Sequence, residues 1–348
     1  MTIGADARLG YDSALGIADE STYGTANTSA ALGGFIKFNS EGLKENITEV
    51  LIPTINTTRA YIDRFQANVE VSGPVEYPLH HTDGLKFIKH VMGGTITTAT
   101  NGVNLSYTHN IIPDDNLTPI ANIVTATSLT IAVRRGSDQN RQYAGIKVNQ
   151  MTISGKIGQT VQCTVDLIGQ KSATIATISA NSPTFTAGLP FTFKDVHFYE
   201  AASIGALTTT SGEQMITGFD LVVNNNIAAG DEVRRLGTNT VALLPPGGMK
   251  DITLNVMQRN DTTTALNNFL NGTPSAILIV MDNGVTIGAA GSSTYSMRIE
   301  LPKCYYNENE SNVGGAGILT KTIPLRCISD STTGNDITIR ITNNSVTI

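Results

Sequence analysis

The sequence contains no tryptophan, and only 6% of its residues are aromatic. Charged residues are also scarce at 15%, and the net charge is −6. A surface that grips nucleic acid needs clustered Lys and Arg, whereas the nearest basic cluster here is the isolated pair Arg134 and Arg135. Carbohydrate-binding sites usually display aromatic rings, which this chain supplies sparingly. The composition argues against a nucleic-acid-binding protein and weakens the case for a carbohydrate-binding module.

Cysteine is rare as well, with three residues in a chain of 348. Cys163, Cys304 and Cys327 form no CxxC or other metal-binding spacing, and an odd number cannot complete an intrachain disulfide framework. Their places in alternating apolar patterns indicate small buried side chains rather than nucleophiles. We therefore expect the protein to be made in a reducing compartment.

Long apolar segments are missing. No run approaches the roughly 18 apolar residues that a membrane-spanning helix needs. The N-terminal MTIGADARLG has neither the basic nor the apolar region of a secretory signal. These absences predict a soluble protein that is made in a cytosol and does not bind a membrane.

Signatures of catalysis are absent too. No GxSxG motif occurs, and the glycine-rich stretches lack the Lys-Ser/Thr of a phosphate-binding loop. His80, His81 and Asp83 could be drawn as metal ligands, but adjacent histidines point in different directions and no third ligand group follows at a coordinating spacing. We interpret them as a turn that leads into a helix, and we expect no enzyme activity, no cofactor and no metal.

Thr, Ser, Asn and Gly carry much of the chain, which is a composition typical of β-proteins. Apolar and polar residues alternate with the period of two that predicts strands with one buried face. The clearest runs are Val161, Cys163, Val165 and Leu167, then Tyr295, Met297, Ile299 and Leu301, and then Ile323, Leu325 and Cys327. The sequence thus predicts a mainly β fold.

One motif occurs twice, as HTDGLKFIKHVMGG at 81–94 and as NDTTTALNNFLNG at 260–272. A single offset of 178 residues (270 − 92) superposes the two copies. Each copy predicts a short helix that an Asp, Asp83 or Asp261, or its neighbour caps at the start and a glycine ends. So short a helix must pack against something larger. The expected core contacts are Ile88, Val91 and Met92 in the first copy and Leu266, Phe269 and Leu270 in the second.

The repeat and the length both indicate two domains, at roughly 150 residues each. Strand patterns flank the helix in both halves, so each domain should be mainly β with one short flanking α-helix. We expect an N-terminal arm at 1–34, a first domain at 35–170, a linker at 171–189 and a second domain at 190–348.

Several stretches in the first half resemble the tail tube proteins of siphoviruses. They are ADESTYGT at 18–25, FNSEGL at 38–43, VSGPVEYP before the helix that ends in VMGG, and the series SLTIAVRRG, QYAGIKVNQMTISG and VQCTVDLIG. The similarity covers roughly residues 18 to 170. The second half keeps the order of elements, although VSGPVEYP has no clear counterpart there. We interpret the chain as the duplicated type of this family, from a thermophilic siphovirus.

The resemblance implies a β-sandwich or barrel in each domain. It implies assembly into stacked rings that form the tube through which DNA leaves the capsid. Because family members with one such domain form hexameric rings, a duplicated chain should form trimeric, pseudo-sixfold rings. The implied partners are further copies of the chain, a tape-measure protein, and tail terminator or tip proteins in the virion. DNA would pass without specific binding, since a weakly charged acidic chain does not hold it by counterion release.

Two charged turns interrupt the strand patterns, EGLKEN at 41–46 and DEVRR at 231–235. They suit either solvated loops or tips that contact the next ring. The candidate contact residues are Glu41, Lys44, Glu45, Asp231, Glu232, Arg234 and Arg235. The competing interpretation of the whole chain is another all-β virion protein, or an adhesin or carbohydrate-binding protein.

Overall fold

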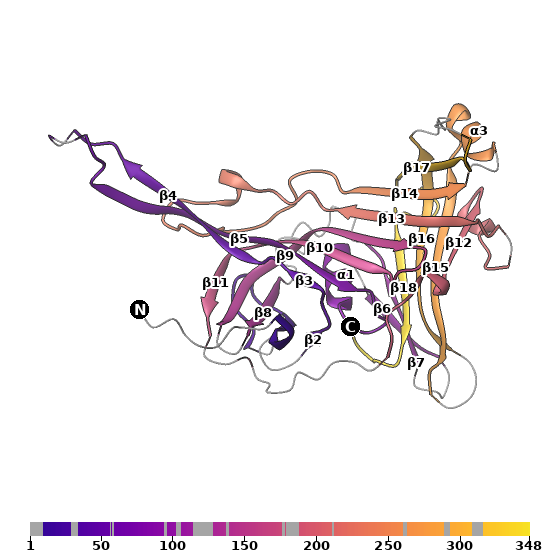
Figure 1. Ribbon diagram of the computed structural model, residues 1–348, viewed down its shortest axis with the longest axis horizontal. Coiled ribbons are helices and arrows are strands. Elements are labelled where there is room, and N and C mark those ends of the chain that lie inside the picture. Colours follow the sequence, from indigo (N-terminus) through magenta and orange to yellow (C-terminus); the bar gives the residue numbers. More distant parts are fainter. Residues whose placement is uncertain are drawn as a thin grey trace.

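The computed structural model describes residues 10–28, 34–55, 57, 59–93, 96–101, 106–113, 128–136, 139–175, 178, 188–210, 212–259, 263–288, 293–307 and 316–348. The described chain is mainly antiparallel β-sheet, as predicted. The molecule is elongated, and a long hairpin projects from one end (Figure 1). None of the described helices is long and apolar enough to cross a membrane.

The first half contains most of the strands. Its elements are η1 (Gly10–Asp12), β1 (Ala14–Asp19), β2 (Phe35–Ile36), β3 (Ser40–Glu41), β4 (Lys44–Ile52), β5 (Asp63–Pro78), α1 (Leu85–Met92), β6 (Ile96–Asn101), β7 (Ser106–Ile111), β8 (Leu129–Arg135), β9 (Gln139–Lys156), β10 (Gln162–Gly169) and β11 (Lys171–Thr174).

The second half follows with fewer elements. They are η3 (Phe193–Asp195), β12 (Val196–Ala201), η4 (Ile204–Ala206), β13 (Ile216–Asn224), η5 (Gly230–Val233), β14 (Asp251–Arg259), α3 (Thr264–Asn271), β15 (Ser275–Thr286), β16 (Thr294–Tyr306), β17 (Thr320–Cys327) and β18 (Thr338–Asn343).

Strand pairing repeats between the halves. The first half pairs in the order β1-β8-β9-β10-β5-β4, and β11 also pairs with β9. The second half pairs in the order β12-β15-β16-β17-β14-β13, and β18 also pairs with β16. Helix α1 packs on β9, and α3 packs on the equivalent strand β16. Cys163 on β10 and Cys327 on β17 therefore occupy equivalent strands, as the sequence repeat predicts.

The two halves share one sheet. Strand β9 pairs with β13 from Lys156↔Gly218 to Gln150↔Asn224, and β18 of the second half pairs with β7 of the first. One buried row crosses both halves. It runs through Tyr77, Cys163, Ile153, Leu221, Leu254 and Leu325. The core is therefore continuous from one half to the other.

Two predicted boundaries are wrong in part. Residues 14–19 lie in the predicted arm, but they form the buried strand β1, which pairs with β8. Residues 171–174 lie in the predicted linker, but they form β11, which pairs with β9. Short strands in Gly-, Ala- and Ser-rich sequence carry too little periodicity to be recognised, and pairing with a long neighbouring strand stabilises them.

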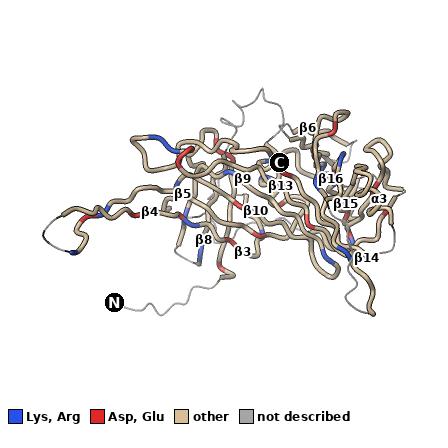
Figure 2. The backbone as a smooth tube through the Cα atoms, turned by 90° about the horizontal axis from the view of Figure 1, so that it is seen from above, with Lys and Arg blue, Asp and Glu red and all other residues tan. Residues whose placement is uncertain are grey.

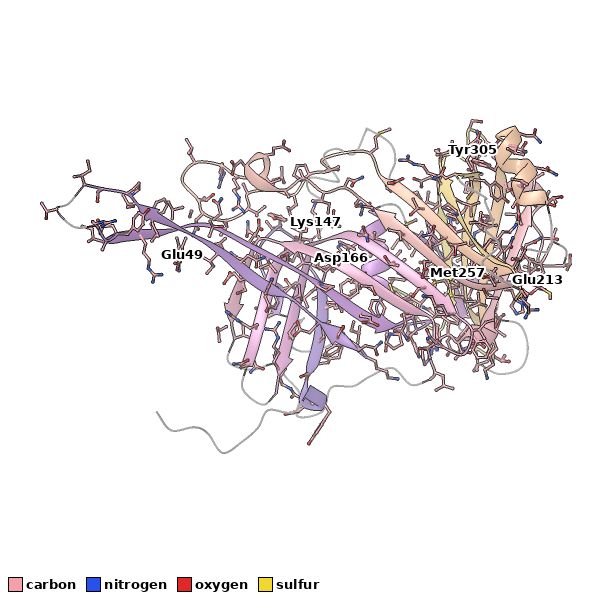
Figure 3. The ribbon with its side chains drawn as sticks, turned by 45° about the horizontal axis from the view of Figure 1, so that its top comes forward. Glu49, Lys147, Asp166, Glu213, Met257 and Tyr305 are labelled. Carbon is pink, nitrogen blue, oxygen red and sulfur yellow. The ribbon has the colours of Figure 1, made fainter. Side chains whose placement is uncertain are left out.

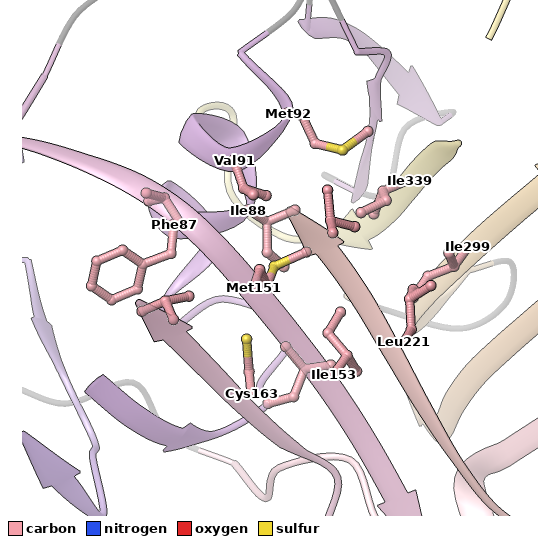
Figure 4. Close-up of a cluster of buried hydrophobic side chains, with 14 of the residues drawn as sticks. Phe87, Ile88, Val91, Met92, Met151, Ile153, Cys163, Leu221, Ile299 and Ile339 are labelled. Carbon is pink, nitrogen blue, oxygen red and sulfur yellow. The ribbon is translucent and has the colours of Figure 1, made fainter. Parts of the chain in front are cut away.

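Helix α1 is buried along its predicted face, with Ile88, Val91 and Met92 all in the main core (Figure 4). Its N-cap is Gly84 in the left-handed conformation, where a Cβ would lie 2.3 Å from the Tyr77 ring. Of the two predicted capping positions, Asp83 or its neighbour, the N-cap is the neighbour Gly84, and it makes no side-chain capping bond. At the other end Gly93, also left-handed, donates its N–H to Lys89 O. Glycine suits both ends because it adopts positive φ without strain.

The second half of the chain covers α1. Asn225 Nδ2 donates to Val91 O at 2.8 Å in the last turn of the helix. At the other end the His81 ring stacks on Tyr295 at 3.9 Å, and Asn343 Nδ2 donates to His81 O. Figure 4 shows Ile339 of β18 and Leu221 of β13 in the same cluster as the helix.

Helix α3 lies in a different environment. Ala265 is buried and Phe269 is partly buried against the core, but Leu266 is 37% exposed and Leu270 is 69% exposed. The prediction that Leu266 and Leu270 make core contacts is therefore wrong for the single chain. The same 178-residue offset pairs them with Ile88 and Met92, which are buried. The N-cap Thr263 makes no side-chain capping bond, and Asp261 lies outside the described residues.

Asp19 at the end of β1 anchors α1. Its carboxylate lies 2.6 Å from His90 Nε2, 3.3 Å from Lys89 Nζ and 3.8 Å from Lys86 Nζ. Burial by itself would raise the pKa of Asp19. The hydrogen bond from His90 and the positive charges of His90, Lys89 and Lys86 outweigh that effect and hold the pKa well below its ordinary value.

Truncating an apolar side chain should have a large effect on stability in α1 and a small one in α3. Ile88→Ala should lower the free energy of unfolding by about 2–5 kcal/mol, because it leaves a cavity in the closed core. Leu270→Ala, at the equivalent flank of α3, should change it by less than about 0.5 kcal/mol in the unassembled chain. Urea denaturation measures both; equal losses would contradict the burial difference.

Asp19→Asn should destabilise the protein at pH 7 but not in acid. Because the folded-state pKa of Asp19 is depressed, its stabilisation is present above the unfolded-state pKa of about 3.9 and is lost as the pH falls through the lower, folded-state pKa. Denaturation of both proteins between pH 7 and pH 3 should show the difference shrinking below about pH 4. A difference that stays constant with pH would disprove the linkage.

Candidate functional site

The β4–β5 hairpin is the most prominent projection of the molecule (Figure 1). Its strands pair from Lys44↔Ser72 outward to Ile52↔Asp63. Strand β5 has 16 residues, and at about 3.3 Å per residue it spans roughly 50 Å. The inner end of β5 is held by β10, so the outer end extends beyond the body as a two-stranded ribbon.

Exposed apolar side chains gather on this hairpin. They are Ile47, Val50, Leu51, Ile52, Ile55, Tyr61, Ile62 and Phe65. Both faces of the ribbon carry them, because β4 shows no alternation between buried and exposed positions beyond Asn46. A folded monomer rarely exposes so contiguous an apolar surface unless another molecule covers it.

The outer edge of β4 is also open. Among the described strands, β4 pairs only with β5, whereas its equivalent β13 pairs with β14 on one side and with β9 on the other. An unpaired edge offers a row of backbone donors and acceptors to another strand. The first half therefore lacks the neighbour that the second half has.

The loop between β13 and β14 shows what such a neighbour does. This loop, 225–250, folds onto β5 and β10. Val69 N donates to Asn239 O at 2.8 Å, and Arg234 Nη2 lies 2.8 Å from Glu70 Oε2. A small cluster of Ala228, Val233, Val241 and Leu244 packs on Ile168. In the first half the equivalent strands β4 and β5 extend away from the body instead, with Ile52 and Asp63 at the free end of the hairpin (Figure 1).

The predicted turn at 41–46 is not a hairpin tip. Strands β3 and β4 both pair with β5, and the chain only bulges between them at Gly42. Across from the bulge Gly73 has a φ of 152°, and a Cβ there would lie 2.2 Å from Gly42 O. Glycine is required at 73 because the two backbones nearly touch. The tip of the hairpin instead lies between the end of β4 at Ile52 and the start of β5 at Asp63.

The predicted contact residues of the first turn are mostly engaged within the chain. The Glu41 side chain is only 10% exposed and lies 2.6 Å from Arg135 Nε. Arg135 also donates to Leu43 O, and its hydrogen bond to the Glu41 carboxylate is the main cause that raises the pKa of Arg135. Glu45 Oε1 accepts from Ser172 N at 2.8 Å, while Lys44 is exposed.

The second predicted turn falls in and beside η5. Asp231, Glu232 and Arg235 are exposed, but Arg234 holds the loop to β5 through Glu70. Both predicted turns therefore border β5: Asn46 is the register partner of Glu70, and Arg234 binds the Glu70 side chain. The sequence patterns did not identify the tip of the β4–β5 hairpin, although Pro53 after the apolar run VLI indicates that the strand ends there.

A second open surface lies beside α3, far from the hairpin tip (Figure 1). A cleft of about 390 Å³ separates the helix from β14 and β17. Apolar side chains line much of it, among them Val256, Ile323 and Leu325. Together with Leu266 and Leu270 on α3, the cleft leaves an apolar region that no described segment covers.

The outward face of the shared sheet is polar. One row runs Glu76, Thr164, Thr152, Val222, Thr253 and Arg326, and the next runs Pro74, Asp166, Gln150, Asn224 and Asp251. Figure 3 shows Asp166 and Lys147 on this sheet, and Figure 2 shows acidic and basic residues scattered along the backbone. Arg326 pairs with Asp251 at 3.0 Å. Most side chains in these rows are therefore polar or charged, and Arg326 is their one basic residue.

No group of three or more His, Cys, Asp or Glu residues that could hold a metal occurs within the described ranges. The rings of His80 and His81 lie 4.1 Å apart. Burial, then the neighbouring charges of His80 and Lys37, lower the pKa of His81 to about 4. The pair therefore packs as neutral rings between the two halves of the chain.

The Glu41–Arg135 pair predicts a fold defect rather than an assembly defect. Glu41→Gln should lower the free energy of unfolding of the unassembled chain by about 1.5–3 kcal/mol, because it removes the negative charge and one of the two oxygens that accept from Arg135. Glu232→Gln, at an exposed position, should leave it within about 0.5 kcal/mol. Chemical denaturation distinguishes them. An unchanged denaturation midpoint for Glu41→Gln would show that the Glu41–Arg135 pair does not stabilise the fold.

A family model described as "Phage tail tube protein" matches residues 10–327. No curated protein matches the chain. The matched range begins at η1 and ends with β17, so it includes both copies of the repeated strand order. Because the match extends over far more than half of the chain, the chain belongs to the phage tail tube protein family.

Proposed function

We propose that the protein is the ring-forming subunit of a siphovirus tail tube and that its copies close into trimeric rings with pseudo-sixfold symmetry. Family membership already makes it a structural component of a phage tail. One observation carries the finer proposal. The two halves of the chain meet through the edge of β13 and the covered flank of α1, and the equivalent surfaces, the edge of β4 and the flank of α3, are exposed at opposite ends of the molecule. The two repeated units of the chain are the domains expected at 35–170 and 190–348, with β1 and β11 added to the first.

Sheet pairing supplies the contact around the ring. Within the chain, the edge of β13 pairs with β9. The equivalent edge, on β4, is open, and the strand equivalent to β9 is β16. In the proposed ring β4 of one copy therefore adds beside the end of β16 in the next copy, beyond Cys304, where the pairing of β16 with β15 ends. Such a contact joins two different surfaces, and a sixfold arrangement of units closes it after three chains.

Helix burial supports the same contact. The second half of the chain covers the Ile88 and Met92 flank of α1. In the proposed ring the first half of the next chain would cover the equivalent flank of α3, Leu266 and Leu270. The β4–β5 hairpin would then lie over that chain's β14 and β17, as the loop 225–250 lies over β5 and β10. Its exposed apolar side chains would be buried in this position.

The polar sheet face suits a conduit for DNA. DNA carries about one negative charge per 1.7 Å of its axis, so a lumen rich in Lys and Arg would hold it. Asp166 is exposed on this face, and Arg326 is paired with Asp251. A face of Thr, Asn, Gln and Asp lets DNA slide. Stacking of rings needs a further, non-closing contact along the axis, and a tape-measure protein and terminator or tip proteins would set tube length and ends.

Native mass spectrometry with negative-stain microscopy tests the proposal. Assembled material should dissociate into trimers, and the images should show rings or tubes. A double variant, Val50→Lys with Ile52→Lys, should remain folded but stay monomeric, because charge on an exposed edge strand opposes strand addition. Val285→Lys, at a similarly exposed valine on β15, should assemble normally.

Two results would contradict the proposal. A dominant hexamer of full-length chains would exclude the trimeric ring, and assembly by the double variant would exclude the β4 edge. Monomers that bind glycans would instead favour the adhesin interpretation.

A further inference from the structure

Two of the three cysteines face each other across neighbouring strands. Cys304 near the end of β16 is the register partner of Cys327 at the end of β17, and their Sγ atoms lie 2.9 Å apart. Both side chains are buried, with 0% of Cys304 and 5% of Cys327 exposed. Cys163 lies on β10 in the first half, where its neighbour is Tyr77 rather than another cysteine.

The hydrogen-bond pattern places this pair at a position that suits a disulfide. Ile328 N donates to Lys303 O, and Asn307 N donates to Pro324 O. Alternation along an antiparallel ladder makes the intervening pair Cys304↔Cys327 a non-hydrogen-bonded pair, in which the two Cα atoms are about 4.5 Å apart. This separation lies within the range of disulfides, about 4.4–6.8 Å between Cα atoms. No backbone movement is needed to join the sulfurs.

We propose that Cys304 and Cys327 form a cross-strand disulfide once the protein leaves a reducing cytosol and meets a small peroxide oxidant. Cys327, the more exposed sulfur, attacks one oxygen of hydrogen peroxide; the O–O bond breaks, water leaves and a sulfenic acid remains. Cys304 then attacks the sulfenic sulfur, its proton leaves with the hydroxyl group as water, and the S–S bond forms. The two sulfurs together lose two electrons, and the peroxide takes them.

The position of the bond gives it a structural consequence. Strand β17 pairs with β14 over eight residues but with β16 over only three, from Cys304↔Cys327 to Tyr306↔Leu325. This short ladder joins β14 and β17 to β15, β16 and β18, next to the cleft beside α3. A disulfide here would covalently join β16 and β17, which pair over only three residues, and it would also restrict the conformations of the unfolded chain. Burial raises the pKa of the Cys304 thiol, so closure should be slow near neutral pH and faster in mild alkali.

The test uses the purified full-length chain, reduced and then treated with hydrogen peroxide under native conditions. After denaturation, the number of free thiols per chain should fall from three in the reduced protein to one in the oxidised protein. Tryptic digestion should yield the peptides 304–321 and 327–340 joined, with the loss of two hydrogen atoms. The oxidised form should melt on the order of 5 °C higher than the reduced form, and added dithiothreitol should reverse the shift.

Matched variants separate the pair from the third cysteine. Cys163→Ala should still form the linked peptides, whereas Cys304→Ala and Cys327→Ala should each keep two free thiols after the same mild treatment. Three free thiols in the oxidised wild-type protein, a link that involves Cys163, or a link between two chains would each overturn the proposal. These readouts do not depend on ring assembly, so they stand apart from the test of the proposed function.

Discussion

The pairing of β9 with β13 is the constraint on which the rest of the structure depends. It makes one sheet out of two repeated units and carries a single buried row from Tyr77 to Leu325. It also decides the surroundings of both helices, because the second unit lies over α1 and leaves α3 without an equivalent cover. A molecule built in this way is asymmetric at its ends: one end presents the open edge of β4, and the other presents an uncovered helix and cleft.

Such an asymmetry is what the proposed ring of duplicated subunits requires. In that ring, a chain with two units satisfies one kind of inter-unit contact internally, and further copies would supply the other. The exposed apolar hairpin and the exposed flank of α3 would be costly in a lasting monomer. In the proposed ring both surfaces would be buried.

Two charged clusters of this protein hold packed elements together. Asp19 holds α1 through His90 and two lysines, and Glu41 holds the bulge between β3 and β4 through Arg135. On the outward sheet face Arg326 is paired with Asp251, and Asp166 is exposed. Such a face is consistent with the proposed passage of a polyanion.

The sequence by itself determined the class of fold, the duplication, the two short helices and the buried face of α1, because these depend on local periodicity and on a repeated motif. It also carried the family resemblance. Only the tertiary structure decided that β1 and β11 are strands, that Gly84 rather than Asp83 begins α1, and that Leu266 and Leu270 are exposed. The same holds for the hairpin tip, which lies between Ile52 and Asp63 rather than at 41–46. The reason is physical: whether an apolar or charged residue is buried depends on which distant strand lies against it, and equivalent residues such as Ile88 and Leu266 have different neighbours although their local sequences are alike.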